Sequence, residues 1–479
     1  MKIIEKYKNM ALPLRATIAF GIASFAISGI NYITTPIFTR ILSTADYGTI
    51  AVYNSWFSII QVFATLTMVY PGILQVGLYE YSENRWKYLS SVIGCISVVS
   101  CGLIVISSIF HSFVSDLLHL DFDLILLILL TCLFQSATTL WITKHRYEYD
   151  YKMATVISVS TAVLAQIVSI AAVLIARNAN FESLASIRLW SAGAVNILVG
   201  VVLYIYIISK GKTVIDIPLW KETLIVVIPL IPHYLSSVVM TSTDKIMIEN
   251  MIGKSEAGIY ALAAVLSSLG VLFWRALSTT FSPFINSRLG NEEFEEINEK
   301  IVPVLRFVAW TCFLGALVAP ELILVLATRD YMPGIFAVPP VVVSIFLHAL
   351  YSVFSAIAFF HKESTRIMTA SVISAIANIV LNYVCIKNFG YIAAGYTTMF
   401  SNLLLTGLHY YNMRKIEPRK IYDFRSIASI TLLLSVGCLL CNFLYSANTF
   451  IRYIFVVFAL VMIARQKTPV VKAISGMKI

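Results

Sequence analysis

The residues best suited to chemistry form a stripe in the apolar segment 223–244. Its members recur every three or four residues: His233, Ser237, Met240 or Thr241, and Asp244. That spacing places them on one side of an α-helix, with His233 and Asp244 about 16 Å apart along it. An imidazole can carry protons near neutral pH, and a carboxylate can titrate or bind Na⁺. We therefore expect His233 and Asp244 to couple the protein to an H⁺ or Na⁺ gradient.

A second polar stripe occurs in the segment 15–38, about 210 residues earlier. Its members match those of the first stripe one by one: Ser24, Ser28, Asn31 and Thr35. Serine, threonine and asparagine also join membrane helices by packing and hydrogen bonds, and for any single residue this is the simpler interpretation. Two stripes at equivalent positions favour a hydrated cavity, in which Asn31 and Ser237 would contact a polar ligand.

Arg275 lies inside the apolar segment 257–279, where a charged side chain is costly unless it faces a cavity or a partner. Its planar guanidinium suits the paired oxygens of a phosphate or diphosphate, so we expect Arg275 to bind such a group. The alternative is that the side chain extends to the lipid headgroups.

Further charged residues are expected at the outer ends of the predicted first and seventh helices: Arg40, Asp244, Lys245 and Glu249. They would pair with each other as an outer gate, or bind a travelling cation. Glu249 is therefore a third candidate for ion coupling, beside Asp244 and His233. For Lys245 and Glu249, simple interfacial charge pairs are an equally good interpretation.

The composition excludes a soluble enzyme. Only 13% of the 479 residues are charged, whereas soluble domains carry about 25%, and 59% are hydrophobic. The sequence contains no Walker A loop, zinc-protease motif or serine-hydrolase elbow, so we expect no catalytic residue, no metal and no cofactor beyond H⁺ or Na⁺. Membrane topology and anionic lipids explain the net charge of +10 better than nucleic acid does.

The elements that must position these residues are membrane helices, each needing about 20 mostly apolar residues. We predict fourteen: 15–38, 48–70, 88–110, 121–142, 154–176, 186–208, 223–244, 257–279, 303–326, 337–360, 367–386, 391–412, 426–444 and 449–464. Lysine and arginine concentrate in alternate loops, which places both termini in the cytoplasm by the positive-inside rule. The predicted fold is an all-α, polytopic membrane protein.

The order of short motifs indicates an internal repeat. Two pairs of segments share their layout at nearly the same offset: 36–48 with 244–260, and 153–158 with 368–374. We predict two six-helix halves and two extra helices with a cytoplasmic tail, at 1–210, 211–415 and 416–479. Halves of this kind commonly enclose a central substrate cavity.

Three motifs resemble those of the Wzx-type polysaccharide and O-antigen flippases, the oligosaccharide flippase branch of the multidrug/oligosaccharidyl-lipid/polysaccharide exporter superfamily. They are PIFTRILSTADYG at 36–48, Asp244 followed by Ile248 and Gly258-Ile-Tyr260, and Asn378-Ile-Val-Leu-Asn382 followed by Gly390-Tyr-Ile-Ala-Ala394. The resemblance extends from about Pro36 to Ser401. The last motif departs from the family at Ala393, where a second glycine is usual, and at Gly395, where alanine is usual.

The resemblance implies a flippase of the bacterial cytoplasmic (inner) membrane. Such a protein moves undecaprenyl-diphosphate-linked oligosaccharide units to the periplasmic leaflet by alternating access, for lipopolysaccharide O-antigen or capsule assembly. The implied partners are that lipid-linked oligosaccharide, membrane lipids, and a polysaccharide polymerase with its chain-length regulator. A cationic cavity would receive the diphosphate, with Arg275, Arg40 and Lys245 as the matching candidates. A multidrug or metabolite cation antiporter of the same superfamily, and a membrane polysaccharide polymerase, are the alternatives.

Overall fold

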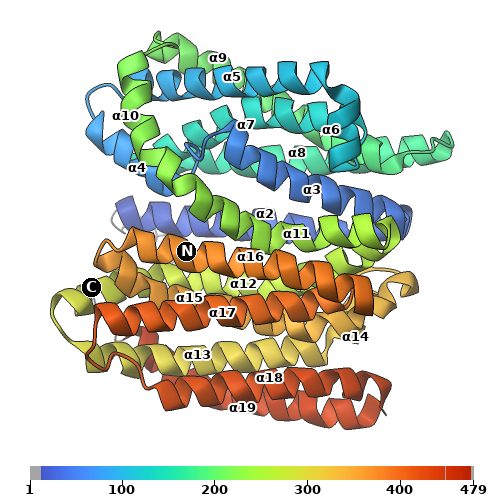
Figure 1. The fold of residues 1–479 in the computed structure, drawn as a ribbon, viewed down its shortest axis with the longest axis vertical. Helices are drawn as coiled ribbons and strands as arrows, with labels where there is room; N and C mark the ends of the chain where they lie inside the picture. The colour runs from blue at the N-terminus through green and yellow to red at the C-terminus, as the bar shows by residue number, and fades with distance from the viewer. Residues whose placement is uncertain (1–11, 448, 476–479) are drawn as a thin grey trace, which may run out of the picture. The chain divides into compact units, whose positions relative to one another are not determined.

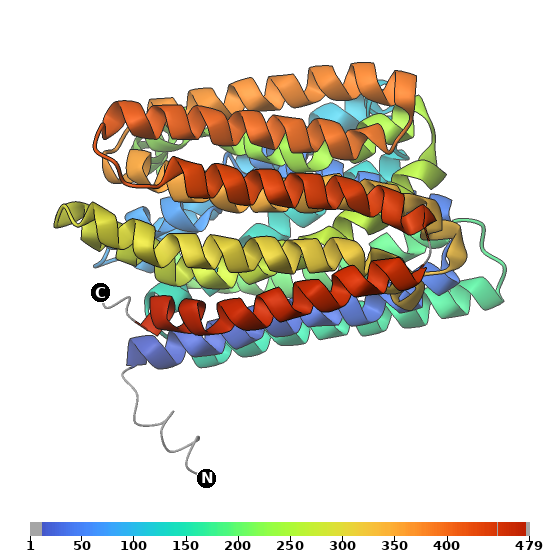
Figure 2. The ribbon, with the colours of Figure 1, turned by 90° about the horizontal axis from the view of Figure 1, so that it is seen from below.

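Every regular element in the described part of the chain is helical. The computed structural model describes residues 12–447 and 449–475 (Figure 1). The chain forms two compact units, Met1–Val238 and Val239–Ile479, with the boundary inside α11 (Ile231–Met251). Within each unit the long helices run roughly along one common direction (Figure 2). The prediction of an all-α fold is confirmed.

The first unit is built around α7, which has the largest buried share among the candidate spans of this unit. Its helices before α11 are α2 (Leu12–Ile41), α3 (Thr44–Ala64), α4 (Pro71–Glu80), α5 (Arg85–Ile109), α6 (His111–Leu118), α7 (Phe122–Tyr147), α8 (Tyr151–Asn178), α9 (Leu184–Gly211), α10 (Ile217–Val227) and the 3₁₀ turn η1 (Ile228–Leu230). Helices α5 and α9 pack against α7, and α2 packs against α8. Pro229 and Pro232 lie where η1 separates α10 from α11, since a proline cannot donate the backbone hydrogen bond that a continuous helix requires.

The second unit is built around α15, the candidate span with the largest buried share. Its helices after α11 are α12 (Lys254–Gly290), α13 (Phe294–Leu317), α14 (Ala319–Leu326), the 3₁₀ segment η2 (Arg329–Ala337), α15 (Val338–Phe360), α16 (Ser364–Phe389), α17 (Ala393–Ile416), α18 (Phe424–Ser446) and α19 (Thr449–Ser475). Helices α12, α13, α17 and α18 contact α15, and α16 lies along α17. Both α18 and α19 pack against α13.

All fourteen predicted membrane segments coincide with helices. Among the described residues, eleven helical stretches are long and apolar enough to cross a bilayer, and the other three predicted segments correspond to α3, α12 and α17. Some predicted ends differ from the structure. The segment 303–326 is interrupted at Val318, between α13 and α14, and α19 continues beyond residue 464 to Ser475.

The first family-like motif contains a helix-start signal. Ser43 and Asp46 form a capping box: the Ser43 hydroxyl accepts a hydrogen bond from Asp46 N at 3.0 Å, and Ser43 N donates to Asp46 Oδ2 at 3.1 Å. This reciprocal pair satisfies backbone donors that the first turn of α3 would leave unpaired. Part of the motif therefore serves local folding.

The division into compact units is not the same as the predicted division into repeats. Compactness places the boundary after Val238, whereas the predicted repeat boundary lies at residue 210. The repeat boundaries concern internal symmetry, and they stay a prediction.

Candidate functional site

Asp244 is a buried carboxylate on α11, with 4% of its surface exposed. Its Oδ2 accepts hydrogen bonds from the Tyr260 hydroxyl on α12 and the Thr398 hydroxyl on α17, each at 2.7 Å. Its Oδ1 accepts one from Nδ2 of Asn382 on α16, also at 2.7 Å. A buried charge is costly unless polar groups surround it, and these three donors supply that environment.

A second layer of polar side chains surrounds this carboxylate. Asn382 Nδ2 also donates to Asn378 Oδ1 at 3.2 Å, and the Thr397 hydroxyl donates to Asn382 Oδ1. Asn378 Nδ2 in turn donates to Thr398 Oγ1 at 3.4 Å. We call the set the Asp244 network: Asp244, Tyr260, Asn378, Asn382, Thr397 and Thr398. It joins α11, α12, α16 and α17 within the second unit.

The turn between α16 and α17 sets the register of the network. Helix α16 ends at Phe389, and Gly390 follows with φ of 81°, a backbone conformation that favours glycine. The chain reverses there, so that Thr397 in the second turn of α17 lies opposite Asn382 near the end of α16. The family-like motif at 390–394 is therefore the turn that assembles the site.

The close packing of α17 gives a physical reason for Gly395, one of the two positions at which the sequence departs from the family pattern. A Cβ atom at this position would lie 3.0 Å from Pro340 Cγ and 3.1 Å from the carbonyl oxygen of Ala337. Helix α17 therefore packs unusually close to the start of α15 at this point. A glycine at 395 permits the approach, and the neighbouring Ala393 is buried.

The Asp244 network suits a proton or a monovalent cation. Its polar atoms are carboxylate, amide and hydroxyl oxygens together with amide nitrogens, and hard cations prefer such oxygens. In the described ranges no group of three or more His, Cys, Asp or Glu residues could hold a metal ion. The network could release or take up one positive charge at Asp244 when its hydroxyls and amides reorient.

Lys245 and Glu249 follow Asp244 on α11. Lys245 Nζ donates to the carbonyl oxygen of Thr241 at 2.8 Å, one turn back. Glu249 lies one turn further along and is buried, with 9% of its surface exposed. Their predicted roles in ligand binding and ion coupling stay predictions.

The remaining predicted site residues lie outside the network. In the first unit, Arg40 donates Nη1 to the carbonyl oxygen of Pro36 at 2.9 Å, and Asn31 Oδ1 accepts from Gln166 Nε2 on α8 at 3.1 Å. Ser237 is exposed.

His233 and Arg275 complete the predicted set. His233 packs edge-on against Tyr234 at 5.4 Å between ring centroids, and its Nδ1 has no hydrogen-bond partner in the described part of the chain. Arg275 lies in α12, but its side chain falls outside the described residues.

The sequence predicts Asp244 as a site residue but does not predict its partners. Tyr260, Asn378 and Asn382 belong to the family-like motifs without a predicted role, and Thr397 and Thr398 are not predicted at all. One signal was available, because Asn378 and Asn382 are spaced by one helical turn inside the mostly apolar segment 367–386. Such a pair marks a polar face that needs a partner in the membrane.

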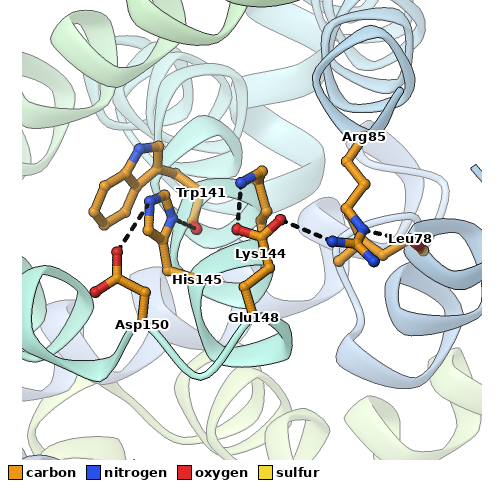
Figure 3. A network of polar contacts seen from close by, with 7 residues as sticks. All are labelled: Leu78, Arg85, Trp141, Lys144, His145, Glu148 and Asp150. Atoms are coloured by element: carbon orange, nitrogen blue, oxygen red, sulfur yellow. Dashed lines mark hydrogen bonds and ion pairs between the residues drawn. The ribbon is translucent and has the colours of Figure 1, made fainter. Parts of the chain in front are cut away.

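The first unit holds a different polar cluster, where α4 and α5 meet the end of α7 (Figure 3). Glu148 accepts from Arg85 Nη1 at 3.1 Å and from Lys144 Nζ at 2.5 Å, and Arg85 Nε donates to the carbonyl oxygen of Leu78 at 3.1 Å. Partial burial raises the pKa of Glu148, but the two cations outweigh it, so the pKa lies below its usual value. The satisfied contacts indicate a structural clamp between α4, α5 and α7.

An apolar groove of about 590 Å³ lies between α13, α18 and α19. Aromatic and aliphatic side chains such as Trp310, Leu434 and Phe458 line it, and Arg306 is the charged residue among those that do. A groove of this composition can hold a hydrocarbon chain.

Fold and spans define a polytopic α-helical membrane protein, and comparison with known proteins assigns its family. The family described as polysaccharide biosynthesis protein matches residues 14–287, more than half of the chain, so the chain belongs to this family. The predicted relationship to polysaccharide exporters is thereby confirmed. No curated protein sequence matches the chain.

Solved structures of lipid and drug transporters share the fold. The lipid II flippase MurJ in an inward closed conformation is 16% identical, with a TM-score of 0.71 over 94% of this chain and 98% of that one. An inward-facing multidrug resistance MATE transporter of the MOP superfamily is 13% identical, with a TM-score of 0.55 over 84% and 98%. A MOP superfamily transporter from Pyrococcus furiosus is 15% identical, with a TM-score of 0.55 over 85% and 97%. At these identities the likeness establishes the fold.

Proposed function

We propose that this protein is a flippase for a lipid-linked oligosaccharide. Its substrate would be an undecaprenyl-diphosphate-linked repeat unit, moved from the cytoplasmic to the periplasmic leaflet of the bacterial inner membrane for O-antigen or capsule assembly. Both termini would lie in the cytoplasm, and a polymerase would use the exported units. Transport, not catalysis, is the proposed activity, and alternating access is the proposed mechanism.

The observation that carries the proposal is the Asp244 network in a member of the polysaccharide biosynthesis protein family. A single buried carboxylate on α11, held by neutral donors from three other helices, can change its contacts when H⁺ or Na⁺ binds. Such a change would alter how α11, α12, α16 and α17 pack. Coupling to an ion gradient requires that ion binding shifts the protein between such arrangements of its helices. Intramembrane ionisable groups usually have this kind of role.

The proposed substrate has three chemical parts, and the chain offers candidates for each. Arg275, Arg40 and Lys245 are proposed to bind the diphosphate, while Asn31 and Ser237 are proposed to contact the sugars. The groove between α13, α18 and α19 would accommodate part of the polyprenyl chain. His233 and Glu249 are proposed to assist Asp244 in coupling.

The test is deletion of the gene in its host, followed by complementation. Surface polysaccharide and lipid-linked repeat units are measured, and an impermeant glycan-processing enzyme reports which units face the periplasm. Lost surface polymer with units trapped on the cytoplasmic side supports the flippase. Complementation by wild type but not by Asp244→Asn, at equal membrane abundance, supports the coupling role.

A multidrug or metabolite cation antiporter is the second candidate, favoured by the shared fold with MATE transporters. Intact surface polymer after deletion, with raised sensitivity to cationic compounds, would select this function. Periplasmic units that accumulate without being polymerised would instead point to a polymerase. The three outcomes exclude one another.

A further inference from the structure

A small apolar cluster lies next to the Asp244 network, one to two helical turns away. Met240 on α11, Ala375 on α16 and Leu405 on α17 form it, with exposed fractions of 6%, 5% and 4%. Met240 is four residues from Asp244, and Leu405 is seven residues beyond Thr398. Each helix that contributes to the cluster therefore also contributes to the network.

Polar residues continue along α17 past Thr398, both before and beyond Leu405 of this cluster. Asn402, Thr406 and His409 are buried and recur at three- and four-residue spacings after Thr398. At 1.5 Å per residue, this row of polar side chains extends about 16 Å along α17 from Thr398 to His409. Tyr351 on α15 packs against the apolar cluster and also against the His409 ring, with 5.1 Å between ring centroids.

Some side chains of this polar row form hydrogen bonds within α17 itself. Asn402 Nδ2 donates to the carbonyl oxygen of Thr398 at 2.9 Å, and the Thr406 hydroxyl donates to that of Asn402 at 2.7 Å. Such bonds are common where polar residues only join helices. The polar row alone therefore does not distinguish residues that only join helices from residues that line a pathway for a cation.

Ser374 supplies the independent observation. It is fully buried on the face of α16 that also carries Asn378 and Asn382, and it precedes Ala375 of the cluster. Its hydroxyl has no hydrogen-bond partner among the described residues, whereas the buried Ser371 hydroxyl is bonded to the carbonyl oxygen of Ile367 at 3.0 Å. An unpaired buried hydroxyl costs free energy unless water or an ion reaches it in another conformation.

We propose that the coupling cation leaves Asp244 between α16 and α17 toward the carboxyl end of α17, and that Met240, Ala375 and Leu405 close this route in the present conformation. The inference rests on the proposed coupling role of Asp244. With both termini in the cytoplasm, the route opens to the cytoplasmic side. Ser374, Asn402 and Thr406 would replace water around a monovalent cation, H⁺ or Na⁺, as it passes.

The test uses the purified full-length protein in liposomes without any oligosaccharide substrate. Leu405→Ser places a hydroxyl in the cluster, and Leu403→Ser makes the same change on the 49% exposed side of α17. Uptake of ²²Na⁺ down a Na⁺ gradient and uptake of H⁺ reported by internal pyranine are measured separately. We expect Leu405→Ser to take up one of the two cations about fivefold faster than wild type and faster than Leu403→Ser. The assay that responds identifies the cation.

The double variant Leu405→Ser with Asp244→Asn tests whether the leak passes the carboxylate. Return to the wild-type rate supports the route, whereas a leak that persists without Asp244 overturns it. Equal uptake by Leu405→Ser and Leu403→Ser also overturns it. If Leu405→Ser does not fold, Ala375→Ser, with Ala377→Ser as its control on another side of α16, is read in the same way.

Failure of this route and failure of the proposed function are separable. The complementation experiment with Asp244→Asn measures coupling in cells and does not depend on Leu405. If surface polymer requires Asp244 while Leu405→Ser has no effect on ion uptake, the coupling role stands and the route is wrong.

Discussion

Asn382 on α16 donates a hydrogen bond from Nδ2 to Oδ1 of Asp244 on α11 at 2.7 Å, although 138 residues separate them in the sequence. The same amide nitrogen donates to Asn378, so one side chain links the carboxylate to the interior of α16. Movement of α16 relative to α11 would break this bond, and loss of charge at Asp244 would weaken it. This relationship connects the charge state of Asp244 to the arrangement of the helices.

Asp244→Asn should lower transport per molecule by about tenfold or more, with a smaller effect on membrane abundance, because the amide cannot carry the coupling charge. Export of repeat units normalised to protein in the membrane is the measurement. Glu295→Gln, the same chemical change at an exposed position of α13, serves as the control. Equal transport per molecule in Asp244→Asn and Glu295→Gln would remove Asp244 from the coupling mechanism.

Tyr260→Phe removes one donor to Asp244 and leaves the ring in place. Since Oδ2 of the buried carboxylate then keeps only the Thr398 hydroxyl as a donor, we expect the free energy of unfolding to fall by about 1–3 kcal/mol. Thermal unfolding of the detergent-solubilised protein measures the change. Tyr79→Phe, at a side chain with 73% exposure, should leave the midpoint unchanged. A Tyr260→Phe protein as stable as wild type would show that the bond to Asp244 contributes little.

Gly395→Ala and Gly407→Ala form a matched pair on α17. A Cβ at Gly407 meets nothing within 4 Å, so its alanine variant should gain about 0.5–1 kcal/mol from helix propensity. At Gly395 the new methyl meets Pro340 and Ala337, and overpacking of about 1–3 kcal/mol should outweigh that gain. Unfolding midpoints that shift in opposite directions support the close packing of α17 on α15. Similar gains in both variants would contradict it.

Acid should weaken the clamp at Glu148. The pKa of Glu148 is lowered in the folded protein. Its ion pairs therefore stabilise the folded state fully at pH values above the ordinary glutamate pKa of about 4.3. This stabilisation is lost as the pH falls through the lowered pKa of the folded state. We expect wild type to exceed Glu148→Gln in stability by about 1 kcal/mol at pH 7, since the pair is partly exposed. Unfolding midpoints recorded from pH 7 to pH 3 should converge. A pH-independent difference would assign the effect to packing.

Arg275→Ala should weaken binding of an undecaprenyl-diphosphate lipid by about tenfold or more if the guanidinium contacts the diphosphate. Binding to the purified protein in nanodiscs is the measurement. Arg306→Ala is the control, because Arg306 is an exposed arginine in the groove between α13, α18 and α19 and its loss removes a different cation within a membrane segment. Unchanged affinity in Arg275→Ala would mean that this side chain only reaches the lipid headgroups.

The sequence by itself determined the class of protein and the number and placement of its main helices. Apolar runs, charge-poor composition and the loops between them are local properties, so each of the fourteen predicted segments could be placed without knowing its neighbours. Helix ends were less certain, because breaks such as the one at Val318 depend on how a segment packs. Asp244 was also found from the sequence, as a carboxylate where carboxylates are costly.

Only the tertiary structure decided what surrounds Asp244. Its partners lie on α12, α16 and α17, and nothing in their local sequence states which helices will meet or in what register. That choice depends on long-range packing, including the turn at Gly390 and the close approach at Gly395. A periodic polar face predicts that a partner exists, whereas the identity of the partner is a property of the whole folded unit.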